Sequence, residues 1–267
     1  MLPLTLWTLA LPVSGEEKPL WEIGLGVGAV SFPEYRGSNR QRNLVLPLPY
    51  LVYRGEIFKA DRDGLRGKIF NSDRVKLSLS ASASIPVDSN SHGPRRGMPD
   101  LKPTVELGPS LEFNLWWDEA NKARFDLRLP VRAAYTFSGK YVGVIFSPAL
   151  NFNTDPFGHS GWNLGALAGP IFASVRQHKY FYDVKPRYAL PDRPAYSASG
   201  GYSGTQSVVS LSKRFDKFWF GGFVRYDTLR GAVFADSPLV RRQYAWMGGL
   251  GITWMLGEST QTVGGND

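Results

Sequence analysis

The chain has 267 residues, a net charge of +8 and a slightly negative mean hydropathy of −0.22. It contains no cysteine and no run of apolar residues of the length a membrane-spanning helix needs, which excludes disulfides, thiol catalysis, thiolate metal sites and a helical membrane protein. Its basic residues are spread along the chain without a nucleic-acid-binding motif, so we expect no nucleic-acid partner.

The N-terminal stretch, residues 1–15, is apolar and ends in small residues just before Glu16, Glu17 and Lys18. This pattern is typical of the apolar core and cleavage region of a secretory signal peptide. We therefore expect a signal-peptide-like segment over residues 1–18. The alternative is an N-terminal segment folded inward as a plug.

Alternation of apolar and polar residues dominates the rest of the chain. Residues 75–87 place every apolar side chain on one face of an extended strand, and the same pattern recurs in residues 104–116 and 123–135. Such stretches exceed an ordinary strand of about 5–6 residues and suit the roughly 9–11 residues that a tilted strand needs to cross a bilayer. The candidate strands are 21–31, 44–53, 56–62, 65–70, 75–87, 104–116, 123–135, 141–152, 162–173, 201–213, 218–228 and 243–256.

These strands predict an all-β protein, a single antiparallel transmembrane β-barrel over residues 19–256, followed by a flexible C-terminal tail over residues 257–267. Splitting residues 56–70 at Asp63-Gly64, a turn-forming pair, gives about 12 strands and leaves both chain ends in the periplasm. A barrel of about 10 strands, with this segment folded partly inward, is the alternative. A soluble β-sandwich is less favoured, since its strands are normally shorter.

The connections orient the predicted barrel. Long external loops are expected at 88–103, 174–200 and 229–242, and short periplasmic turns at 71–74, 117–122 and 214–217. The loop 174–200 is rich in arginine and lysine, which suits clamps for the phosphate groups of outer-membrane lipid and lipopolysaccharide. An ordinary solvated loop is an equal alternative.

The hairpin 104–135 predicts ion pairs in the lumen. Its polar face carries Glu106 and Glu112 on one strand and Arg128 and Arg132 on the next. Antiparallel pairing would bring Glu112 close to Arg128 and Glu106 close to Arg132. We expect these pairs to fill the interior with little water; the alternative is that both sets face a wet channel.

No motif for catalysis, metal binding or cofactor binding stands out. The histidines are scattered without a metal-ligand partner, and His178 lies in a loop with Asp183 and several serines but without a diagnostic spacing. A loop histidine of this kind is expected to be solvent-exposed. The glycines of residues 24–28 belong to a predicted strand and not to a phosphate-binding loop.

Several blocks, in order, carry a family resemblance. They are GVGAVSFPEYRGSNRQRNLVLPLPYLVYRGEIFKADRDGLRGKIF (26–70), RGMPDLKPTVELGPSL (96–111), YFYDV (180–184), YSASGGY (196–202) and DSPLV (236–240). These blocks resemble the MipA/OmpV family of outer-membrane proteins over residues 21–256.

The resemblance implies an outer-membrane scaffold without catalytic residues, which brings a lytic transglycosylase together with a bifunctional murein synthase. Other members of the family are described as adhesins or porin-like proteins, so a surface adhesin and a narrow pore for small solutes remain alternatives. Asp61, Arg62, Asp63 and Gly64 form the candidate recognition segment. Barrels of this type usually end on an aromatic residue, whereas this chain continues past Trp254, Met255 and Leu256.

Overall fold

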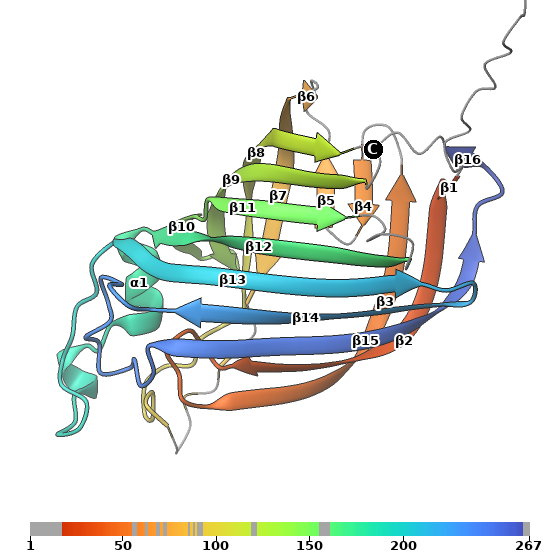
Figure 1. The fold of residues 1–267 in the computed structure, drawn as a ribbon. Coiled ribbons are helices and arrows are strands. Elements are labelled where there is room, and N and C mark those ends of the chain that lie inside the picture. The colour runs from red at the N-terminus through yellow and green to blue at the C-terminus, as the bar shows by residue number, and fades with distance from the viewer. Residues whose placement is uncertain are drawn as a thin grey trace, which may run out of the picture.

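The computed structural model describes residues 18–54, 58–61, 64–67, 70–71, 74–84, 86–87, 89, 93–118, 122–154 and 161–263, which form one large antiparallel sheet and one small sheet (Figure 1). The large sheet has 14 strands in the order β5-β4-β3-β2-β15-β14-β13-β12-β10-β9-β8-β7-β6, and β11 pairs with β12 and β9. Its strands are β2 (Trp21–Pro33), β3 (Gln41–Arg54), β4 (Phe58–Asp61), β5 (Gly64–Gly67), β6 (Phe70–Asn71), β7 (Val75–Ala83), β8 (Thr104–Asp118), β9 (Ala123–Thr136), β10 (Tyr141–Phe146), β11 (Ala149–Thr154), β12 (Trp162–Ala173), β13 (Gly201–Arg214), β14 (Phe218–Thr228) and β15 (Tyr244–Glu258). The small sheet joins β1 (Lys18–Pro19) and β16 (Thr262–Val263).

The predicted all-β class and antiparallel sheet are confirmed. Along β2, residues Trp21, Ile23, Leu25 and Val27 are exposed on one face, while the intervening residues are less exposed and face inward. This period of two is the one that the sequence showed, because successive side chains of a strand point to opposite faces. Among the described residues, no helix is long and apolar enough to cross a membrane.

Several strand boundaries differ from the predicted ones. The strand predicted over 141–152 is divided into β10 and β11, since Ser147 and Pro148 separate them and proline lacks the N–H that a ladder needs. The strand predicted over 75–87 ends at Ala83, close before Pro86. At the C-terminus β15 continues to Glu258, so the boundary predicted at residue 256 lies inside a strand.

Both ends of the described chain are held in the small sheet. Lys18 lies opposite Val263 and Pro19 opposite Thr262, so residues 257–263 are not a free tail. Leu20 N–H donates to Gln261 O at 2.9 Å, and Ser259 N–H donates to Trp21 O at 2.9 Å. The predicted signal-peptide-like segment lies outside the described residues, except for Lys18.

The large sheet is strongly curved, and its two ends approach each other (Figure 1). Cα atoms of β5, at one end of the strand order, lie within 8 Å of Cα atoms of β7, next to the other end. The strand β3 pairs with β2 over residues 41–53, but with β4 only through Tyr53 and Arg54. Among the described residues, the second edge of β3 therefore carries no ladder along most of its length, including Pro47 and Pro49.

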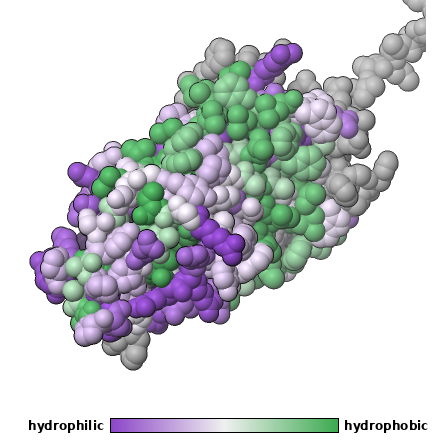
Figure 2. Space-filling model, turned by 60° about the vertical axis from the view of Figure 1, so that its left-hand side comes forward, coloured by the Kyte–Doolittle hydropathy of each residue, from purple (hydrophilic) through white to green (hydrophobic). Residues whose placement is uncertain are grey.

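Four long connections pack into one structure, here called the loop cap, which comprises residues 34–40, 93–103, 174–200 and 229–243. It contains α1 (Val175–Tyr182) and the 3-10 helix η1 (Pro186–Tyr188), and it lies at the end of the sheet opposite β1 and β16 (Figure 1). The core of the cap is apolar and comes from all four connections: Tyr35, Leu101, Tyr182, Val184, Ala198, Leu229, Ala232, Phe234 and Leu239. Figure 2 shows hydrophobic residues gathered over the sheet and hydrophilic residues gathered at the end that carries the cap.

Candidate functional site

The inner face of the sheet carries a network of ion pairs on β7, β8 and β9. Arg132 Nε lies 3.1 Å from Glu106 Oε2, and both side chains are 15% exposed. The other nitrogens of Arg132 donate to Ser80 Oγ at 3.2 Å and Ser147 Oγ at 3.1 Å. One guanidinium group thus connects four segments of the chain.

The second predicted pair occupies neighbouring positions of the same two strands. Glu112 lies directly opposite Arg128 in the register of β8 and β9. Ser78 Oγ donates to Glu112 Oε1 at 2.8 Å, and along β9 Arg124 Nε lies 3.3 Å from Asp126 Oδ2. Of the two predicted pairs, the structure shows the contact between Glu106 and Arg132, and it places Glu112 and Arg128 opposite each other in the sheet register.

A further ion-pair group joins the sheet to the loop cap, and the sequence analysis missed it. Asp227, which is buried, accepts from Arg36 Nε at 3.1 Å and from Arg225 Nε at 2.7 Å. Arg36 also donates to Ser203 O at 2.9 Å. The alternation of Arg225 and Asp227 on one face of the predicted strand 218–228 was the available signal.

Aromatic and apolar side chains from β3 and β14 lie on another part of the inner face of the sheet. Tyr50 and Trp219 face each other with ring centroids 6.0 Å apart, and Tyr50 Oη donates to Glu22 Oε2 at 3.0 Å. A Cβ atom at Gly221 would lie only 2.2 Å from the Trp219 ring, so this glycine leaves the space that the indole fills. Leu48 likewise packs against glycine positions of β2 and β15.

His178 is buried, so the expectation of a solvent-exposed histidine was wrong. Its Nδ1 lies 2.6 Å from Ser199 O and its Nε2 lies 2.5 Å from Ser203 Oγ, while its ring packs on Phe234 with centroids 4.6 Å apart. Burial lowers the pKa of His178, which favours the neutral ring. With the ring only 2% exposed and Nδ1 hydrogen-bonded to a backbone carbonyl, His178 holds the cap to β13 and has no access to a substrate.

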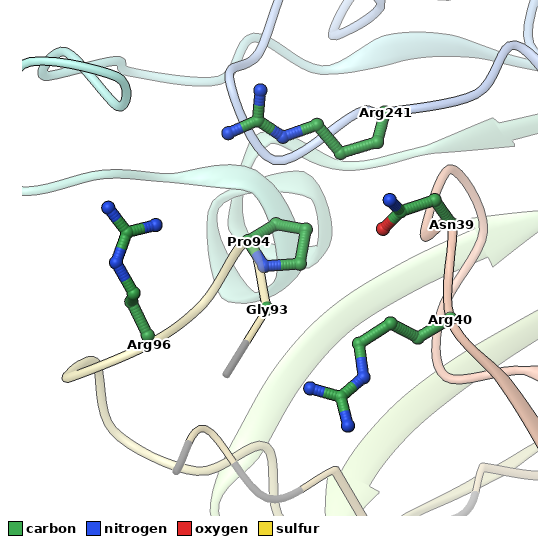
Figure 3. Close-up of a pocket in the computed structure, with 6 residues that line it drawn as sticks. All are labelled: Asn39, Arg40, Gly93, Pro94, Arg96 and Arg241. Carbon is green, nitrogen blue, oxygen red and sulfur yellow. The ribbon is translucent and has the colours of Figure 1, made fainter. Parts of the chain in front are cut away.

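A pocket of about 270 Å³ opens on the loop cap and is lined by three arginines (Figure 3). Arg40 and Asn39 come from the first connection, Arg96 with Gly93 and Pro94 from the second, and Arg241 from the last. Arg96 Nη2 lies 2.6 Å from Asp192 Oδ1, and Arg241 Nη2 lies 4.0 Å from Asp192 Oδ2. The hydrogen bond from Arg96 lowers the pKa of the Asp192 carboxyl.

The basic loop predicted over 174–200 is folded into the cap and is not an ordinary solvated loop. Arg193 is only 1% exposed and donates to backbone carbonyls of Tyr188, Pro94 and Arg96 at 2.6–3.2 Å. Burial, followed by the nearby charge of Arg96, lowers the pKa of Arg193. This arginine therefore fixes the backbone of the pocket from below.

The candidate recognition segment is described only in part. Asp61 at the end of β4 lies opposite Gly64 at the start of β5, and β4 in turn pairs with Tyr53 and Arg54, at the end of the sheet away from the cap. Arg62 and Asp63 lie outside the described residues. Within the described ranges, no group of His, Cys, Asp or Glu side chains has the arrangement of a metal site.

Comparison with known proteins gives consistent similarities. A family model described as "MltA-interacting protein MipA" matches residues 25–256. The outer membrane protein OmpV of Vibrio cholerae is 25% identical over 208 residues, which cover 76% of this chain and 75% of that protein, and Omp26La of Vibrio anguillarum is 24% identical over the same length. Among solved structures, the COG4313 outer membrane channel from Pseudomonas putida F1 covers 93% of this chain and 100% of its own, with 11% sequence identity and a TM-score of 0.44.

Proposed function

Because the chain belongs to the MipA family, we propose that it is an outer-membrane β-barrel with a filled interior, which acts as a scaffold for murein-remodelling enzymes. The partners proposed are a lytic transglycosylase and a bifunctional murein synthase. As a member of this family with OmpV-like relatives, the protein is located in the outer membrane and is not an enzyme.

The barrel part of this proposal rests on the length and the outer face of the strands. Seven of the described strands have 12 to 15 residues, more than the roughly 9–11 needed to cross a bilayer. Their outward side chains form a large exposed apolar surface, which is more stable in contact with lipid than in contact with water. The more exposed members are Leu25, Val45, Leu51, Leu107, Leu115, Val209, Leu250 and Leu256. Aromatic side chains at strand ends, such as Trp21, Tyr53, Tyr135, Tyr141, Tyr244 and Trp254, suit the headgroup regions.

The observation that carries the proposal is that the interior and one end are occupied. Arg132 and its partners project from one part of the inner face of the sheet, Trp219 and Tyr50 from another, and the packed core around Phe234 lies at the end that carries the cap. These groups reduce the space open to solutes. A filled barrel of this kind acts through its surfaces, which favours a binding or scaffold role over a pore.

The end away from the cap is the proposed site for the enzymes. It carries β1, β16 and the hairpin of β4 and β5, and in a barrel with short periplasmic turns this end faces the murein layer. The family description names an MltA-interacting protein, which supports a lytic transglycosylase as one partner. Asp61 and Gly64 belong to this end through the pairing of β4 with Tyr53.

Affinity capture tests the proposal. The tagged full chain is recovered from gently solubilised envelopes, and the bound proteins are identified by mass spectrometry. We expect a lytic transglycosylase and a murein synthase with the native chain, loss of both with the double variant Asp61→Asn with Asp63→Asn, and retention with Asp192→Asn in the cap. If both enzymes are missing from the capture of a chain shown to be folded by heat-modifiable gel mobility, the scaffold role is wrong.

Planar-bilayer conductance tests the filled interior separately. The native chain should conduct no measurable ion current, since charged and aromatic side chains occupy its interior. A steady open conductance would refute the filled interior and support the pore. Surface binding that is lost when residues 229–242 are deleted would support the adhesin.

A further inference from the structure

The arginine pocket of the loop cap has features of a built anion site and is independent of the proposed enzyme partners. Its three guanidinium groups come from connections that are more than 50 residues apart in sequence, and the fold brings them to one opening (Figure 3). Guanidinium groups in water repel one another when gathered in this way, so an arrangement of this kind favours an oxyanion between them.

The backbone that carries each arginine is fixed. Arg241 N–H donates to Gly37 O at 2.7 Å, and Arg40 N–H donates to Ser38 Oγ at 3.1 Å, where Ser38 is buried. Arg96 follows Arg95, which is buried. Arg193 fixes the backbone on both sides of Arg95, since it donates to Pro94 O at 2.9 Å and to Arg96 O at 2.7 Å. The pocket is therefore preorganised, which reduces the entropy lost on binding.

One residue of the chain already shows what the pocket accepts. The Asp192 carboxylate contacts Arg96 and approaches Arg241 with its two oxygens, and its side chain is 54% exposed at the surface. Asp192 thus acts as an internal oxyanion that an external one could displace or join.

The partners of these arginines show the chemistry that the pocket accepts. Glu34 Oε1 lies 3.3 Å from Arg40 Nε, and Asp192 contacts Arg96 and Arg241. Beneath them, buried Arg193 donates to backbone carbonyls of Tyr188, Pro94 and Arg96. Oxyanion oxygens are thus the groups that the three guanidinium groups already bind within the chain.

From these observations we infer that the pocket of Arg40, Arg96 and Arg241 binds the phosphate group of a phosphorylated saccharide. Arginine forks match the tetrahedral oxygens of a phosphate, and the volume of about 270 Å³ leaves space for part of the attached sugar beside Asn39 and Gly93. Gly93 has a φ of +115°, and a Cβ atom there would lie 3.0 Å from Arg40, so glycine keeps this guanidinium in place. The saccharide can come from lipopolysaccharide of the outer leaflet or be a free sugar phosphate.

The test uses the full chain folded in non-ionic detergent without phosphate. Inorganic phosphate is titrated at constant ionic strength and followed by calorimetry, and the titration is repeated with micelles that contain intact or chemically dephosphorylated lipopolysaccharide. We expect saturable binding that weakens at least about tenfold in Arg96→Gln with Arg241→Gln, since each lost charge-assisted hydrogen bond corresponds to roughly a tenfold change. Asp192→Asn should tighten binding, because the competing carboxylate is gone.

The matched control is Arg187→Gln with Arg242→Gln, which removes the same charge from exposed arginines of the cap outside the pocket lining. It should bind like the native chain. Equal weakening by both double variants, or no saturable binding of either probe to the folded chain, would overturn the inference. Preference for intact over dephosphorylated lipopolysaccharide would identify the lipid-linked source, and binding of inorganic phosphate without that preference would identify the free one.

Discussion

The ion pair of Glu106 and Arg132 offers a direct test of how the interior is stabilised. We consider Glu106→Gln, Arg132→Gln and the double variant. The charged atoms are 3.1 Å apart with both side chains 15% exposed, and at an effective dielectric constant of about 20 the attraction of such a pair is about 5 kcal/mol before desolvation. Desolvation offsets much of this, so we expect a coupling free energy of about 1–3 kcal/mol.

The losses of stability caused by Glu106→Gln and Arg132→Gln should add up to more than the loss caused by the double variant. Glu106→Gln leaves the Arg132 guanidinium in the interior with the hydroxyls of Ser80 and Ser147 but without its carboxylate. The free energy of unfolding is measured by urea titration of the protein refolded into lipid vesicles, with the folded fraction read from heat-modifiable gel mobility.

The exposed pair of Arg214 and Glu258 is the control. Its atoms are 3.6 Å apart, Glu258 is 58% exposed, and its coupling should not exceed about 1 kcal/mol. Additive effects at Glu106 and Arg132, with a coupling no larger than that of the control pair, would refute the view that the interior is held by paired charges.

Three other changes test different parts of the fold. Because burial lowers the pKa of His178, the unfolded chain binds a proton more readily than the folded chain. The contribution of His178 to the stability of the cap should therefore be complete above about pH 6.5 and should decline as the pH falls below it. In unfolding titrations across this range, the decline should be smaller in His178→Gln. Gly143→Ala should destabilise the protein by about 1–3 kcal/mol in the same urea assay, because Gly143 has a φ of +147° and its Cβ would lie 2.5 Å from Ser174 Oγ, the N-cap of α1. An unchanged midpoint would contradict this. Leu250→Arg should reduce the stability of the lipid-inserted protein by about 2–4 kcal/mol because Leu250 lies on the proposed lipid face, and a tolerated arginine would argue against that placement.

The sheet could be predicted from the sequence because a strand leaves a local pattern. The period of two in residues 104–116 and 123–135 fixed both the strands and their inward faces, and a hairpin with one short turn limited the register enough to place Glu106 near Arg132. Arg225 and Asp227 follow the same rule and contact each other, but their third partner could not be found from a local pattern, since Arg36, which contacts Asp227, is 191 residues away.

The loop cap could not be predicted in the same way. Its contacts join distant connections, such as the hydrogen bond from Tyr35 Oη to Leu239 O across 204 residues, and no periodic pattern marks them. A buried histidine and a buried arginine look like solvated residues in the sequence, since such side chains are usually exposed. His178 and Arg193 are buried because backbone carbonyls that are distant in sequence accept their hydrogen bonds.

The second edge of β3 has a consequence for how the chain behaves beside other chains. Along most of its length this edge has no ladder among the described residues, and an open edge is a template on which another extended segment can add. Pro47 and Pro49 are alternate residues, so their missing N–H groups fall on the same edge, and prolines are tolerated in a ladder only on the side away from the paired neighbour. An incoming strand would find no donors at these two positions. The two prolines thus protect this edge of the folded sheet from edge-to-edge aggregation.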